Sequence, residues 1–204
     1  EVGVASTKSF TSQLIVLLSI AMKIGIYNKN ITSEKYENFI ENLKLVPNFL
    51  SKILLLNEEF INLAQAIKNS QNVLYLGRGI LYPLALEGAL KLKEVSYIHS
   101  EGFAAGEMKH GPIALIEEGL PIIMFLTSDG FEEKSISNLQ EALARGGEVF
   151  LISDQKNMNK ISFIKNKVLI PSFNGNWNDI FSPIFMSIPA QLIAYHVARE
   201  RGTD

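Results

Sequence analysis

Glu87, Lys91 and Glu94 are the residues whose types and spacing are best suited to acid–base chemistry. At about 100° per residue, their offsets of four and seven place all three within roughly 60° of one helix surface. Leu84 and Leu90 border this charged stripe. Two carboxylates and an ammonium between apolar neighbours can lie in a partly dry cleft, where a carboxylate can move protons. An exposed salt bridge is the alternative, and the spacing alone favours it.

His110 is a second candidate for proton transfer. Residues 106–112 read Gly-Glu-Met-Lys-His-Gly-Pro, and the final glycine and proline exclude a regular helix interior. Histidine titrates near neutral pH, so His110 suits proton transfer to sugar or phosphate oxygens. A surface loop with a chance histidine is the alternative. His99 and His196 lie in apolar surroundings, and we expect them to be core histidines.

Two weaker patterns could contact an anionic or oxygen-rich ligand. Gly77-Arg78-Gly79 lies between an expected strand and an expected helix, where backbone N–H groups could bind a phosphate. A tight strand-to-helix turn is the preferred interpretation of this short run. Ser6-Thr7-Lys8 could contact a ligand, or it could simply cap the helix that follows.

Composition limits the class of protein. The 204 residues, 47% of them apolar, suit one large domain or one domain with a piece of another. A net charge of −2 gives no general case for nucleic-acid binding. The absence of cysteine excludes a disulfide scaffold and a cysteine zinc site, and three scattered histidines do not suggest a metal site. We expect no metal and no cofactor.

The apolar segment Leu14–Met22 is about half the roughly 20 residues that a membrane span needs, so we expect no span. The lack of cysteine fits a cytoplasmic protein. The chain begins with Glu rather than Met, and we expect it to be a piece of a longer protein.

Helical patterns fill residues 1–70, with helices expected at 6–26, 32–45, 47–57 and 58–69, the second capped by Thr32 or Ser33. The core face of the first helix is expected to be Leu14, Leu17, Leu18, Ala21 and Met22. From residue 71, strands at 72–76, 121–126, 148–152 and 167–170 alternate with helices at 83–97, 131–145 and 183–201.

This order predicts an α/β fold, with a Rossmann- or flavodoxin-like parallel sheet in three α/β/α layers, preceded by a helical segment. Ligands bind such sheets beyond the carboxyl ends of the strands, which makes 77–81, 127–130 and 153–155 candidate loops.

Longer strings resemble the glutamine–fructose-6-phosphate aminotransferase family. Residues 1–8 (EVGVASTK) are similar to the end of its first sugar-isomerase (SIS) repeat. Residues 86–101 (LEGALKLKEVSYIHSE) and 104–112 (AAGEMKHGP) resemble its second repeat, as do 194–198 and 202–204 at the end of that repeat. The resemblance implies that 1–26 is the last helix of the first SIS repeat, 27–70 a helical connector and 71–204 the second SIS domain.

The resemblance implies part of an enzyme that makes glucosamine 6-phosphate and glutamate from fructose 6-phosphate and glutamine, the first step of amino-sugar synthesis. In this family the residue matching Glu94 moves a proton between C1 and C2 of the sugar, supported by those matching Lys91 and Glu87. The histidine matching His110 assists ring opening in the neighbouring subunit, which implies a homodimer.

The resemblance also implies missing parts. Val4 and Ser6 would line the sugar site, but nothing here matches the family's glutaminase domain, the phosphate loop of its first SIS repeat, or the carboxyl-terminal tail with its Schiff-base lysine. We therefore expect the chain alone to be inactive or nearly so. Two alternatives stay open: another SIS-fold sugar-phosphate isomerase or deglycase, and a non-catalytic sugar-phosphate sensor, which has no need of Glu94 as a base.

Overall fold

A parallel five-stranded sheet forms the centre of the molecule in the computed structural model, which describes residues 4–203. The ends of the expected outer segments, residues 1–3 and 204, lie outside the described residues. The strand order is β2-β1-β3-β4-β5. The strands are β1 (Asn72–Gly77), β2 (His99–Ala104), β3 (Pro121–Leu126), β4 (Glu148–Asp154) and β5 (Asn166–Ile170).

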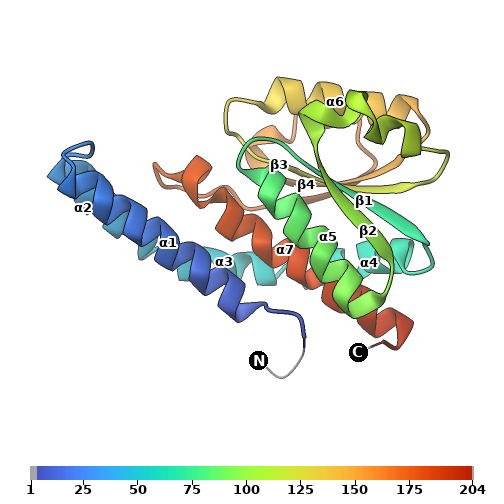
Figure 1. Cartoon of the computed structure of the whole chain (residues 1–204), viewed down its shortest axis with the longest axis horizontal. Coiled ribbons are helices and arrows are strands. Elements are labelled where there is room, and N and C mark those ends of the chain that lie inside the picture. Colours follow the sequence, from blue (N-terminus) through green and yellow to red (C-terminus); the bar gives the residue numbers. More distant parts are fainter. Residues whose placement is uncertain (1–3, 204) are drawn as a thin grey trace.

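Helices cover both faces of this sheet, as Figure 1 shows. Four helices precede it: α1 (Lys8–Tyr27), α2 (Ser33–Leu43), α3 (Val46–Leu54) and α4 (Asn57–Ile67). The others are α5 (Leu81–Ser96), α6 (Glu132–Ala144) and α7 (Asn178–Arg201), with the short 3-10 helices η1 (Ala105–His110), η2 (Pro112–Leu115) and η3 (Gln155–Asn157). α6 lies on one face, α5 and α7 lie on the other, and α1 lies beyond α7 (Figure 1). The predicted three-layer α/β/α fold with a leading helical segment is confirmed.

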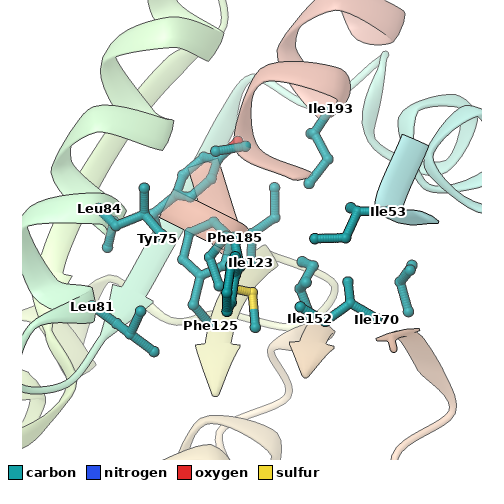
Figure 2. Packing of buried hydrophobic residues seen from close by; sticks show 14 of the residues in the cluster. Ile53, Tyr75, Leu81, Leu84, Ile123, Phe125, Ile152, Ile170, Phe185 and Ile193 are labelled. Atoms are coloured by element: carbon teal, nitrogen blue, oxygen red, sulfur yellow. The ribbon is translucent and has the colours of Figure 1, made fainter. Parts of the chain in front are cut away.

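The sheet separates two apolar cores. In β3, Ile122 and Met124 belong to the core under α6, whereas Ile123 and Phe125 belong to the core under α5 and α7. Figure 2 shows the second core, where strand residues meet Phe185 of α7. Because both faces are covered, the central strands are continuous apolar runs, as the sequence predicts.

The segment 27–70, expected as a connector, packs into the core under α7. Phe49 of α3 lies with its ring centroid 4.4 Å from that of Phe185. Trp177, at the start of α7, donates through Nε1 to Oδ1 of Asn38 at 2.9 Å. The predicted cap of α2 is confirmed at Thr32, whose side chain accepts from the backbone N–H three residues on. The three segment boundaries themselves stay a prediction.

Strand β2 is absent from the strands expected from the sequence. It is an edge strand that pairs only with β1, from Asn72↔His99 to Gly77↔Ala104. An edge strand needs fewer apolar residues, and this one begins His-Ser-Glu-Gly. The core prediction for His99 is wrong, because its side chain is 63% exposed on this edge. Its Nδ1 lies 3.0 Å from Oδ1 of Asn72.

Helix α1 is mostly exposed. Of the five residues expected to form its core face, only Met22 is buried. Leu14 and Leu18 are half-buried against the core, whereas Leu17 and Ala21 are exposed, so the prediction is wrong for these two. By length and hydropathy alone, both α1 and α7 could cross a membrane. This is weak support for a span, because α7 is mostly buried within the fold and a core helix passes the same test.

His196 joins α7 to α4 from inside the core, as predicted. It is buried, and its Nε2 lies 2.7 Å from Oδ1 of Asn57. Burial lowers the pKa of His196, and the nearby positive charge of Arg199 lowers it further, against the opposing charges of Glu58 and Glu200.

The lowered pKa of His196 predicts that the fold loses stability on acidification. The unfolded chain, with a histidine pKa of about 6.5, binds the proton more readily than the folded chain. This contribution is fully present above the unfolded-state pKa and is lost as the pH falls through the folded-state pKa. We expect thermal unfolding to show a lower Tm at about pH 5.5 than at about pH 7.5, and His196→Gln to flatten this dependence. The exposed His99→Gln is the control, and equal flattening by it would contradict the prediction.

Candidate active site

Lys91 lies buried on α5 between the two carboxylates of the predicted stripe. Its Nζ is 3.1 Å from Oε1 of Glu87 and 3.0 Å from Oε2 of Glu94. The side chain of Lys91 is 5% exposed, and those of Glu87 and Glu94 are 17% and 24% exposed. The structure therefore brings the three residues together in a partly dry setting, and the alternative of an exposed salt bridge is wrong.

The two carboxylates keep the ammonium of Lys91 charged. Burial alone lowers the pKa of Lys91, but hydrogen bonds and negative charge from Glu94 and Glu87 outweigh it, so the pKa lies above its ordinary value. In return, the ammonium supplies a fixed positive charge beside each carboxylate. Such an ion triad can present a carboxylate in a fixed orientation to a bound substrate.

A pocket of about 190 Å³ opens beside this ion triad. Its walls come from Val4 in the segment before α1, from Lys91 and Val95 on α5, and from Gln191 and Tyr195 on α7. Val4 is therefore brought to the ion triad. Ser6 lies in the same segment and is half-buried. The pocket has the mixed apolar and charged lining that small polar ligands use.

Gln191, which the sequence does not single out, fixes the end of the segment before α1. Its Nε2 donates to the backbone carbonyl of Thr7 and to Oγ1 of Thr11, both at 3.2 Å. Val95 also lines the pocket, near the end of α5. Its backbone carbonyl accepts a hydrogen bond from Oγ1 of Thr203 at 2.7 Å. The only sign of Gln191 in the sequence is that its amide side chain interrupts an apolar stretch of α7.

Glu87 also borders a second hollow, of about 340 Å³, between α1, α5 and α7. The other residues that line it are apolar: Phe10, Leu14, Ile80, Pro83, Leu84, Leu86, Leu90 and Pro183. The ion triad therefore lies along the seam between α5 and the elements packed on it. This position differs from the general expectation that ligands bind at the carboxyl edge of the sheet.

The chain does not bring His110 to Glu94. Helix α5 begins after β1 at the carboxyl edge of the sheet, so Glu94, near its end, lies toward the amino edge. His110 ends η1, which follows β2 at the carboxyl edge and packs against α6. At about 3.3 Å per residue, a six-residue strand separates the two edges by roughly 20 Å.

The loops at the carboxyl edge are occupied by internal contacts. Gly77-Arg78-Gly79 forms a tight turn, with the N–H of Leu81 bonded to the carbonyl of Arg78 at 3.0 Å, in agreement with the preferred interpretation. In the loop after β3, Ser128 donates through its backbone N–H to Oδ2 of the buried Asp154 at 3.0 Å. Across residues 4–203, no group of three or more His, Cys, Asp or Glu side chains is arranged to hold a metal ion.

Comparison with known proteins identifies the class. Residues 66–201 match the SIS domain family, so the chain belongs to that family. Over its whole length the chain is 48% identical to the glutamine–fructose-6-phosphate aminotransferase (isomerizing) of Zymomonas mobilis and 44% identical to that of Mesorhizobium japonicum. It spans about a third of the length of these curated relatives.

A solved structure gives the same result. The C-terminal domain of glucosamine–fructose-6-phosphate aminotransferase from Francisella tularensis matches with a TM-score of 0.93 and 38% identity. The match covers 100% of this chain and 56% of that one. The particular relationship is therefore to the C-terminal isomerase part of these aminotransferases.

The ion triad predicts a specific loss of stability. Lys91→Met keeps the apolar stem but leaves two partly buried carboxylates without their cation. We expect the free energy of unfolding, measured by urea titration, to fall by about 1–3 kcal/mol. Lys93→Met, on the exposed side of the same helix, is the matched control and should change it by less than about 0.5 kcal/mol. Equal losses from the two variants would contradict the account of the ion triad.

Proposed function

We propose that this chain is the isomerase part of an enzyme that makes glucosamine 6-phosphate and glutamate from fructose 6-phosphate and glutamine. The observation that carries the proposal is the buried Lys91, paired with Glu87 and Glu94 beside a pocket. The aminotransferase names of relatives matching the whole chain support the substrate and the reaction. A cytoplasmic location remains a prediction from the sequence.

In the proposed reaction Glu94 moves a proton between C1 and C2 of the open-chain sugar. A carboxylate can take a proton from one carbon and return it to the next when both lie within hydrogen-bond reach. Lys91 donates to Oε2 of Glu94 at 3.0 Å and so fixes the orientation of the carboxylate that accepts the proton in this proposal. Glu87 balances the other side of the ammonium. Val4 and Ser6 line the sugar site in this proposal.

His110 opens the sugar ring in the site of a second copy of the chain. An imidazole can give and take a proton near neutral pH, as ring opening requires. His110 is exposed and lies at the opposite edge of the sheet from Glu94 of its own chain. These two facts support a role in a neighbouring subunit, and hence a homodimer.

The exposed apolar face of α1 supports a preceding SIS repeat. Val16, Leu17, Ile20, Ile24 and Tyr27 are exposed on it. By contrast α7, the last helix of this SIS domain, is mostly buried. We propose that α1 is the corresponding last helix of a first SIS repeat. The rest of that repeat would cover this apolar face and bind the phosphate of the sugar. The isolated 204 residues would then have little or no activity.

The test uses the full-length parent protein with fructose 6-phosphate and glutamine, and mass spectrometry of the products. We expect glucosamine 6-phosphate from the parent, and a loss of about 10²- to 10⁴-fold in kcat for Glu94→Gln. The control Glu37→Gln lies on an exposed position of α2 and should retain activity.

Two other results would contradict the proposal. Interconversion of hexose phosphates without nitrogen transfer would make the parent a simple isomerase. Binding of fructose 6-phosphate without any product, unaffected by Glu94→Gln, would make it a sugar-phosphate sensor.

A further inference from the structure

The 3-10 helix η1 places His110, and contacts within η1 hold it in position. Among the described residues, no side chain forms a hydrogen bond or an ion pair with the imidazole of His110. Its position therefore depends on the backbone of η1. Met108 anchors η1 from below, since it is fully buried in the core under α6. Gly111 follows His110 with φ of 148°, a conformation that favours glycine and lets the chain turn sharply there.

Helix α6 holds η1 from the side through an ion pair. Nζ of Lys109, the residue before His110, lies 2.8 Å from Oε1 of Glu141. The hydrogen bond from Lys109 holds the pKa of Glu141 below its ordinary value. Glu141 is only 24% exposed on its side-chain surface and also accepts from Asn138 at 3.5 Å. Ser137 of the same helix donates to this carboxylate as well, at 3.5 Å, so contacts within α6 help to orient it toward Lys109.

The turn after β1 also packs against η1, through Arg78. Nη1 of Arg78 donates to Oδ1 of the buried Asn138 at 3.2 Å, and the guanidinium lies 5.8 Å from the centroid of the Phe131 ring. The backbone of Gly106 passes over this guanidinium so closely that a Cβ there would lie 3.0 Å from Nη1. Arg78, Lys109, Asn138 and Glu141 thus form a connected set, here named the η1 clamp.

We infer that the η1 clamp positions His110 for ring opening, with Glu141 as its central positioning residue. The inference rests on the proposed function, because it takes His110 as the ring-opening group. Proton transfer depends steeply on geometry, so release of η1 lowers turnover more than it weakens sugar binding.

The test compares kinetic losses in two backgrounds of the full-length parent. His110→Ala should lower kcat by about 10²-fold or more. Glu141→Ala removes the contacts of the carboxylate with Lys109, Asn138 and Ser137 while keeping a good helix former. It should lower kcat about tenfold with KM for fructose 6-phosphate changed less than about twofold. In the His110→Ala background, Glu141→Ala should cause almost no further loss, because the group that it positions is gone.

Glu200→Ala is the matched control, since Glu200 forms an ion pair of the same 2.8 Å length with Lys68 elsewhere on the surface. It should leave kcat unchanged. Lys109→Arg should retain more activity than Lys109→Met, because it can keep the ion pair.

Three results would overturn the inference. An equal loss from Glu141→Ala in both backgrounds would show a general structural effect. If Glu141→Ala causes no loss while His110→Ala causes a large one, the η1 clamp has no positioning role, but the proposed role of His110 stands. No loss from His110→Ala would overturn that role and the clamp together.

Discussion

Burial of the Lys91 ammonium is the constraint on which the candidate site depends. An unpaired charge inside a protein costs several kcal/mol, so a buried lysine requires partners at close range. Helical geometry supplies them from one element, because residues four before and three after Lys91 lie on the same surface. A buried lysine with two partly buried carboxylates is a poor way to gain stability, since apolar side chains of similar volume often serve as well. Its presence beside a pocket is therefore better explained by chemistry.

The parallel sheet then separates the two chemical groups of the proposed reaction. Each strand-to-helix turn begins at the carboxyl edge, so a residue near the end of α5 and a residue after β2 lie at opposite edges. Within one SIS domain the ion triad and His110 cannot meet. In the proposed reaction a second chain brings them together, so each has to be held rigidly on its own edge. The pairings on α5 do this for Glu94, and the η1 clamp does it for His110.

Much of this architecture follows from the sequence. The apolar runs of β1, β3 and β4 predict a doubly covered sheet, and helical spacing alone places Glu87, Lys91 and Glu94 on one stripe. Strand β2 is not predicted because it is polar and has only one neighbouring strand. The prediction that His99 lies in the core fails for the same reason, since His99 begins this edge strand. The prediction that Leu17 is buried fails because an apolar pattern shows which residues share a helix face but not whether another element covers that face. The contacts of Gln191 and Glu141 join residues far apart in the chain, which periodicity does not report.

A crystal structure of the full-length parent with fructose 6-phosphate bound tests the central claim most directly. The account predicts that the sugar lies in the pocket beside Lys91, with the Glu94 carboxylate within hydrogen-bond reach of C1 and C2. It also predicts that His110 of a second subunit lies next to the ring oxygen. A sugar bound at the carboxyl edge of this sheet, with the ion triad remote from C1 and C2, would contradict it.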